Sequence, residues 1–316
     1  MNYGHALEFG VFITPRNDDP GAVVELARLA ERVGLDLVTF QDHPYQPAFL
    51  DTWTLLSWVA GKTDRIRLAA NVLNLPLRQP AVLARSVASL DRLAGGRVEL
   101  GLGAGAFWDA IAAMGGRRLK PGEAVQALDE AMTIIREVWD GERRGGIYVD
   151  GTYYQVKGAK RGPSPAHAIP IWIGALGPRM LRLIGRRGDG WLPSLAYLKS
   201  LDDLAAGNTI IHEAAAIASR DPRAIRRMLN IGGQFAPPSD RFLVGPPEQW
   251  AEQLAIVTLT YGVSAYILAS DDAAAIEVFA RDVAPATREI VAAERARQGI
   301  VGDRVTAVTR SEGEAQ

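Results

Sequence analysis

The sequence predicts an α/β fold, a (β/α)8 TIM barrel with an insertion between strands four and five. Short apolar runs alternate with amphipathic helical patterns along most of the 316 residues, which is the order of elements in a parallel barrel. The loop after the first run reads TPRNDD and lacks the G-x-G-x-x-G pattern of a dinucleotide-binding fold. Both observations favour the barrel over a doubly wound open sheet, which is the alternative.

Eight segments are strand candidates because strands covered on both faces of a parallel sheet are almost continuously apolar. They are Leu7–Ile13, Leu35–Gln41, Ile66–Val72, Val98–Leu102, Ile171–Ile173, Gly190–Leu192, Met228–Phe235 and Ser264–Leu268.

Helices are predicted between these strands. Gly21–Val33 and Gly122–Trp139 have apolar residues at helical spacing. Asp51 is a good N-cap for a helix over Thr52–Gly61. A further helix begins at Pro80, a residue suited to the first turn, and ends before Gly95-Gly96.

The periodicity of the helix after Pro80 predicts which side chains it buries. We expect Val82, Leu83, Val87, Leu90 and Leu93 to face the sheet, and Arg85, Asp91 and Arg92 to face water.

The insertion spans Gly145–Pro170 and contains a hairpin signal. Asp150-Gly151 stands between two β-favouring runs, which predicts a two-residue hairpin turn. We expect residues 1–298 to form one barrel domain and residues 299–316, which are poor in apolar side chains, to be a disordered tail.

Composition indicates a cytoplasmic enzyme acting on a small molecule. The chain is 48% hydrophobic with a formal net charge of −1, and its scattered basic residues form no stripe for nucleic acid. No apolar stretch reaches the roughly 20 residues that span a bilayer. The absence of cysteine excludes disulfides and thiolate metal sites, and four histidines without paired spacing predict no metal centre.

Candidate catalytic residues follow the strands, because barrel chemistry gathers at their carboxyl ends. The second strand runs into Gln41-Asp42-His43-Pro44-Tyr45. His43 can exchange a proton near neutral pH, and Asp42 can orient a neighbour or bind a ligand. The other interpretation is that His43 only fills a turn.

A candidate phosphate site follows the fifth strand, in the segment GALGPRM from Gly174 to Met180. Gly177 leaves the backbone accessible and Pro178 suits the first helical position, so the exposed amides of a helix N-terminus can meet an anion. Ser194, after the sixth strand, is another candidate hydrogen-bond donor. The other interpretation is that the glycine and proline only mark the start of a helix, where they are common.

Four segments in order resemble the bacterial luciferase-like superfamily of flavin- and deazaflavin-dependent oxidoreductases. They are VTFQDHPYQP, the stretch from Arg65 to Gly105, IPIWIGALGPRMLRLIGRRGDGW and VGPPEQWAEQL. The resemblance covers residues 7 to 295. It implies a barrel with an isoalloxazine-type ring at its mouth, holding coenzyme F420 or FMN, and relatives that are often homodimers.

The resemblance also implies roles for single residues. His43 matches the histidine facing the ring, and Asp42 its neighbour near the cofactor. Asn71 and Val72 match a bulge in strand three, commonly a non-prolyl cis peptide, that supports the ring from behind. The remaining cofactor positions are the backbone amides of Ala175, Leu176 and Gly177 on the phosphate, the polar contact Ser194, and the loop residue Asp109.

One departure bears on the substrate. Some deazaflavin-dependent dehydrogenases carry a glutamate after the glycines of strand four, where this chain has Ala106-Phe107-Trp108. This argues against oxidation of a sugar phosphate and predicts a substrate wall formed by Phe107 and Trp108.

Three functional hypotheses follow. The first is hydride transfer between coenzyme F420 and a small organic substrate, favoured by the Asp-His pair and the Asn71-Val72 bulge. The second is an FMN-dependent monooxygenase using molecular oxygen, because the same barrel and phosphate loop serve both cofactors. The third is a noncatalytic flavin-binding barrel, since a fold alone does not establish chemistry.

Overall fold

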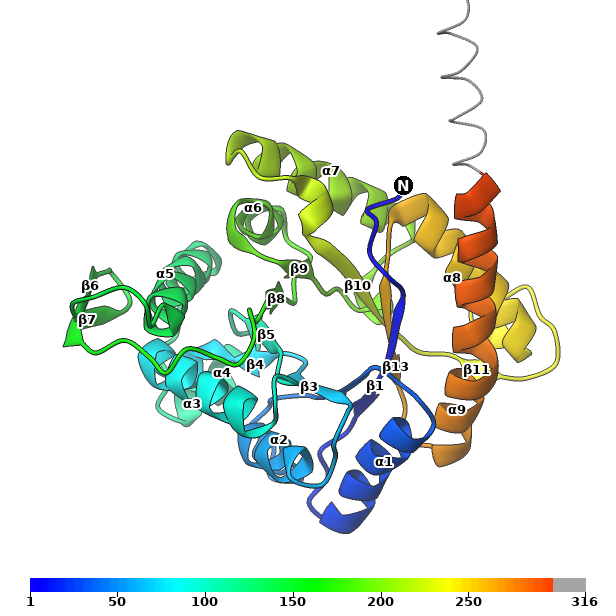
Figure 1. Ribbon diagram of the computed structural model, residues 1–316, viewed down its shortest axis with the longest axis horizontal. Coiled ribbons are helices and arrows are strands. Elements are labelled where there is room, and N and C mark those ends of the chain that lie inside the picture. Colours follow the sequence, from blue (N-terminus) through cyan, green and yellow to red (C-terminus); the bar gives the residue numbers. More distant parts are fainter. Residues whose placement is uncertain (298–316) are drawn as a thin grey trace, which may run out of the picture.

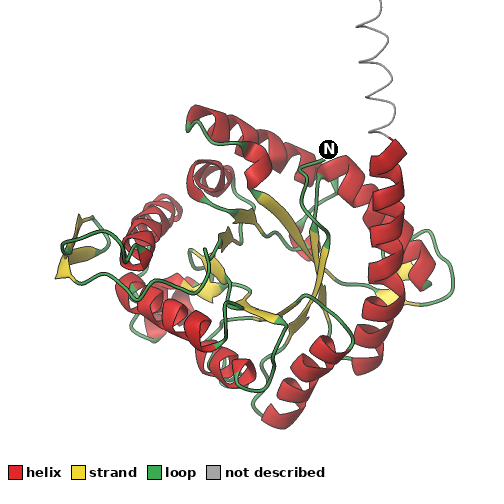
Figure 2. Cartoon of the chain, in the orientation of Figure 1, coloured by secondary structure: helices red, strands yellow, loops and turns green. Residues whose placement is uncertain are grey.

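A barrel of parallel strands surrounded by helices forms the computed structural model, which describes residues 1–297 (Figures 1 and 2). The sheet consists of β1 (Glu8–Ile13), β2 (Leu37–Phe40), β3 (Arg67–Ala70), β4 (Leu73–Asn74), β5 (Leu100–Gly103), β8 (Ile171–Ile173), β9 (Gly190–Trp191), β10 (Arg226–Ile231) and β13 (Ala265–Ala269). They are ordered β3-β2-β1-β13-β10-β9-β8-β5-β4, and every pairing is parallel.

The two ends of this order are one interrupted strand, and this closes the barrel. β3 and β4 are separated only by Asn71 and Val72. β4 pairs with β5, and a parallel bridge joins Leu68 of β3 to Val98 just before β5. The predicted barrel is therefore confirmed, and the open sheet is excluded because no edge remains between β3 and β5.

Helices pack around the outside of the barrel (Figure 2). They are α1 (Pro20–Arg32), α2 (Thr52–Ala60), α3 (Pro80–Leu93), α4 (Trp108–Ala113), α5 (Pro121–Trp139), α6 (Pro178–Arg187), α7 (Asp202–Ile217), α8 (Pro247–Tyr261) and α9 (Ala273–Val278), followed by a π-helical turn over Phe279–Val283 and a helix over 284–297. Short 3-10 turns occupy Leu75–Leu77, Leu195–Tyr197 and Pro222–Ala224. Asp51 caps α2 as predicted, accepting a hydrogen bond from the Thr54 amide.

Alternating strand residues divide the core in two. One cluster lies inside the barrel and includes Leu37, Ala69 and Ile267, with the fully buried Trp172 as its largest member. Their sequence neighbours, such as Val38, Leu68 and Leu268, belong to the larger cluster between the strands and the helices. This alternation is expected for a barrel whose interior is filled by side chains.

The predicted faces of α3 are wrong at three positions. Val82 and Leu93 are exposed, whereas Asp91 is fully buried. The Asp91 carboxylate accepts hydrogen bonds from the backbone amides of Val98 and Ala166 and contacts the His167 ring, so it joins the helix to the start of β5 and the segment before β8.

The insertion between β5 and β8 contains the predicted hairpin, with a longer turn. Strands β6 (Ile147–Asp150) and β7 (Gln155–Ala159) pair through Asp150 and Gln155, so the turn has four residues, 151–154, and the two-residue prediction is wrong. The carboxylate of Glu130 on α5 accepts the amides of Thr152, Tyr153 and Tyr154, which holds the wider turn in place.

The seventh predicted strand is also shorter than expected. β10 ends at Ile231, and after Gly232-Gly233 the short strand β11 (Gln234–Phe235) pairs with β12 (Val244–Gly245) outside the barrel. A Cβ on Gly233 would lie 2.1 Å from the carbonyl oxygen of Leu243, so the chain can cross there only with glycine.

Residues 299–316, predicted as a tail, lie outside the described residues, and the division of the chain at residue 298 stays a prediction. Over 1–297, no helix is long and apolar enough to cross a membrane. The same residues contain no cluster of three or more potential metal ligands.

Candidate functional site

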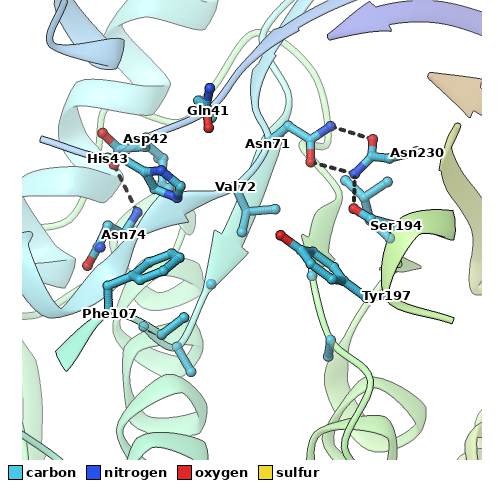
Figure 3. A pocket seen from close by; sticks show the side chains of 18 of the residues that line it. Gln41, Asp42, His43, Asn71, Val72, Asn74, Phe107, Ser194, Tyr197 and Asn230 are labelled. Carbon is cyan, nitrogen blue, oxygen red and sulfur yellow. Dashed lines mark hydrogen bonds between the residues drawn. The ribbon is translucent and has the colours of Figure 1, made fainter. Parts of the chain in front are cut away.

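A cavity of about 370 Å³ opens at the carboxyl ends of the barrel strands (Figure 3). Seven of the eight barrel positions contribute to it. The contributing segments are Phe12 of β1, Gln41 to Tyr45 after β2, Asn71 to Asn74, Gly103 to Phe107, Gly174 to Leu176, Leu192 to Tyr197, and Asn230 of β10.

Val72 forms the back wall of this cavity. The Asn71-Val72 peptide bond is cis, as the resemblance implied. A Cβ on Gly103 would lie 2.8 Å from the Val72 side chain, and Cβ atoms on Gly101 and Gly174 would each lie 3.2 Å from it; at Gly101 the Ala70 carbonyl oxygen, at 2.4 Å, is the nearer obstacle. Because these three residues are glycines, the Val72 side chain packs directly against the backbone of the neighbouring strands.

A chain of polar side chains lies beside Val72 on the cavity floor. Asn71 and Asn230 exchange two amide hydrogen bonds, of 2.6 and 3.1 Å, across the barrel. The Asn230 amide nitrogen also donates to the Ser194 hydroxyl at 3.0 Å. Figure 3 shows Asn71 facing Asn230, and Ser194 joined to Asn230 by a further hydrogen bond. This network fixes Ser194, one of the predicted cofactor contacts, at the end of β9.

Asp42 is fully buried and held by an arginine. Its two oxygens accept both ends of the Arg78 guanidinium, at 3.0 and 2.8 Å, and one also accepts the Asn74 amide. Arg78 further contacts Asp51, the cap of α2. Because its charge is paired and its lone pairs are engaged, Asp42 fixes the loop after β2 and is not a free acid or base.

His43 lies in an aromatic group with Tyr45 and Phe107, here named the aromatic wall. The His43 ring stacks on Tyr45 with centroids 5.4 Å apart, and Phe107 meets both rings at 5.3 and 5.9 Å. Burial lowers the pKa of the His43 imidazole below its usual value, and the nearby Asp42 carboxylate opposes this only in part. Over residues 1–297 the His43 ring nitrogens accept or donate no protein hydrogen bond, so the neutral ring is available to a ligand.

The N-terminus of α6 borders the cavity at Ala175 and Leu176. Gly177 is the N-cap and Pro178 the first helical residue, as predicted. In the described part of the chain, the amides of Ala175, Leu176 and Gly177 have no protein acceptor. Unpaired amides at a helix N-terminus are a ready site for an anion.

Two predicted site residues are placed elsewhere. Asp109 is exposed on α4 and paired with Arg118, and Trp108 packs over Gly105 beside Leu119 and α5. Neither lines the cavity, because α4 leads away from the rim after Phe107. Gly177 lies just behind the lining, at the cap of α6.

Sequence reasoning missed four residues of the site or its support: Arg78, Asn74, Tyr197 and Asn230. Asn74 is 6% exposed, and its side-chain oxygen has no hydrogen-bond partner in residues 1–297. Tyr197 is 74% exposed and lies across Val72 from the aromatic wall (Figure 3). Asn74 is the last residue of β4, and Tyr197 ends the 3-10 turn that follows β9, so the available signal was their place at the carboxyl ends of these strands.

The fold and the site together define a TIM-barrel enzyme with a cavity at the carboxyl ends of its strands and, beside it, backbone amides without a protein acceptor at the start of α6. The family model for luciferase-like monooxygenases matches residues 7–240. The chain belongs to this family.

Two relatives are similar in sequence over most of the chain. Both are F420-dependent glucose-6-phosphate dehydrogenases, from Mycolicibacterium smegmatis and Nocardia farcinica. Each is 34% identical over 71% of this chain and 68% of its own length.

Solved structures with the same fold include enzymes that use either cofactor. An F420-dependent secondary alcohol dehydrogenase in complex with an F420-acetone adduct superposes with a TM-score of 0.77 at 19% identity, covering 90% of this chain and 99% of its own. A type II Baeyer-Villiger monooxygenase from Pseudomonas putida in complex with FMN gives 0.72 at 20% identity, covering 89% and 98%. At such identities the likeness establishes the fold.

Proposed function

We propose that this chain is an F420-dependent oxidoreductase that transfers hydride between coenzyme F420 and a small organic substrate. The observation that carries the proposal is the cavity itself, with the Val72 wall on one side, the aromatic wall on the other and unpaired helix amides at its border. Two F420-dependent relatives at 34% identity support this cofactor.

The residues present fit a planar ring carrying a phosphate. Ala175, Leu176 and Gly177 would hold the phosphate through their amides, and Val72 would support the ring from behind. Ser194 and the buried, unpartnered oxygen of Asn74 supply polar contacts. Burying such an oxygen without a partner costs about 1–3 kcal/mol, and a bound hydrogen-bond donor removes this cost.

His43 holds the proton of the reacting oxygen. When bound, F420 supplies the carbon that accepts or donates a hydride. The half-buried His43 ring is neutral at pH 7 because burial lowers its pKa. One of its nitrogens therefore accepts a hydrogen bond from a substrate hydroxyl, or its N–H donates to a substrate carbonyl.

A direct titration tests the cofactor. We expect the purified protein to bind F420 more tightly than FMN when the two are titrated separately under the same conditions. Tighter binding of FMN, with oxygen-dependent turnover, would establish the monooxygenase alternative. Binding of either cofactor without turnover of any substrate would favour the noncatalytic barrel.

We also propose a homodimer formed through α2 and α3. Trp58, Val82 and Leu93 project from these helices, and two hollows between them are lined by Trp53 and small residues such as Ser86. A face that carries both projections and hollows suits a two-fold contact with a second copy, because each copy supplies what the other lacks.

Light scattering tests this face. Trp58→Glu should convert the dimer to a monomer, whereas Ile217→Glu, at an exposed apolar position on α7, should leave it intact. A monomeric wild-type protein would contradict the proposal. The cytoplasmic location of the enzyme stays a prediction.

A further inference from the structure

Within residues 1–297, the cavity lining contains no cationic side chain that could pair with an anionic substrate. Among the described residues that line it, none is Lys or Arg. The ionisable side chains there are Asp42, His43, Tyr45 and Tyr197, and the Asp42 carboxylate is already paired with Arg78, which lies behind the lining. The N-terminus of α6 is suited to an anion, and the proposed function assigns it to the phosphate of the cofactor.

Aromatic side chains, in contrast, are prominent in the cavity lining. Phe107, which is 55% exposed, stands at the rim with its ring against His43 and Tyr45, and Tyr197 stands across the cavity. Large aromatic side chains left open to water gain free energy when an apolar body covers them, and edge-to-face or offset contacts add to that gain. A phosphate ester placed there would lose its hydration with no partner in return.

We propose that the substrate is an uncharged compound with an apolar or aromatic body and one hydroxyl or carbonyl oxygen, and that phosphorylated sugars are excluded. The body packs against the aromatic wall, and the oxygen meets His43. This inference rests on the proposed function for its orientation relative to the cofactor, but the aromatic wall and the lack of cations in the lining are observed directly in residues 1–297. It separates this chain from the sugar-phosphate dehydrogenases to which it is similar.

Binding of a matched pair of probes to F420-loaded protein tests the inference. Benzyl alcohol and benzyl phosphate share the aromatic body and differ in charge. We expect saturation-transfer NMR titrations to give at least about tenfold tighter binding for the alcohol, which corresponds to about 1.4 kcal/mol. Cyclohexanol should likewise bind in preference to glucose 6-phosphate. Tighter binding of either phosphate ester would overturn the inference, and so would a failure of both alcohols to bind.

Variants at the rim locate the effect. Phe107→Ala should weaken benzyl alcohol binding severalfold, and Phe107→Arg should reverse the preference by giving the phosphate a partner. Tyr148→Ala, at an exposed tyrosine on the distant hairpin, is the matched control and should change neither affinity. Equal benzyl alcohol affinity in wild type and Phe107→Ala would also overturn the inference.

The two proposals fail separately. If FMN binds in place of F420, the proposed function is wrong, and the same probe pair is measured on FMN-loaded protein. The comparison of wild type with Phe107→Ala for benzyl alcohol requires no cofactor.

Discussion

Replacing Arg78 by methionine tests whether the loop that carries His43 depends on a buried ion pair. Arg78 donates two hydrogen bonds to Asp42, whose side chain is fully buried, and its own side chain is only 18% exposed. Methionine keeps most of the side-chain length and removes the charge. The Asp42 carboxylate then retains only the Asn74 amide as a partner.

The expected loss follows from leaving a buried carboxylate without its cation, which costs about 3–5 kcal/mol. With an unfolding entropy of about 2.1 cal/mol/K per residue, a chain of 316 residues should show a decrease in Tm of about 5–8 °C. Removing Asp42 as well should recover part of this loss. The coupling in the double variant Asp42→Asn with Arg78→Met should be about 1–3 kcal/mol.

Thermal unfolding of the cofactor-free protein, followed by circular dichroism, measures both values. Arg16→Met is the matched control, because the Arg16–Asp18 pair is exposed on both sides and should affect Tm little. A decrease in Tm for Arg78→Met no larger than for Arg16→Met would refute the reasoning. So would a double variant that loses the full sum of the two single changes.

Three further variants address the cavity and the other end of the barrel. Gly177→Asp should abolish cofactor binding, whereas Gly177→Asn should retain it. A Cβ at position 177 meets no atom within 4 Å among the described residues other than its chain neighbours, so the two variants differ mainly in charge. Equal cofactor affinities of the two variants in a titration would place the phosphate elsewhere. His43→Ala should lower turnover by about 10²- to 10⁴-fold with little change in cofactor affinity. It should also remove an acid limb expected below pH about 6.5, since the pKa of His43 is lowered by burial. Turnover within a few-fold of wild type would leave His43 a structural residue. The carboxylates Glu99 and Asp91 raise the pKa of His167, so its stabilising charge is fully present below pH about 6.5 and is lost as pH rises through the raised pKa. His167→Gln should therefore lower Tm more at pH 5.5 than at pH 9, and a pH-independent difference would contradict this assignment.

The strands of this barrel were predictable because a strand that is buried on both faces has a nearly continuous run of apolar residues in the sequence. The candidate site was partly predictable for the same reason, since the strands end where the runs end. His43 and Ser194 were found in this way, Asn71 and Val72 were found through the family resemblance, and all four line the cavity.

The residues that the sequence did not reveal act through partners distant in the chain. Asn230 lies inside an apolar strand, and its role becomes visible only through its hydrogen bonds to Asn71, 159 positions away in the sequence. Arg78 resembles a surface arginine until its pairing with Asp42 is seen. Asp91 was assigned to solvent because helical periodicity treats every acid as polar, whereas this one is buried by binding backbone amides.

Trp108 shows a different limit. Its place after a glycine loop suggested contact with substrate, but the peptide leaves the rim one residue earlier, at Phe107. Periodicity identifies α4 only weakly, because the helix has six residues. The direction of a short helix after a loop depends on what it packs against, here Leu119 and the start of α5.

The packing of Val72 against three glycines makes positions 72, 101, 103 and 174 a single steric unit for the purposes of evolution and engineering. A methyl group added to Gly103 would overlap Val72, and a larger side chain at 72 would press on all three backbones. A single substitution of Gly103 therefore forces Val72 to move. Paired libraries, in which a smaller residue at 72 accompanies alanine at 103, offer a route to moving the back wall of the cavity. Covariation between these positions in an alignment of family members would be the natural record of the same constraint.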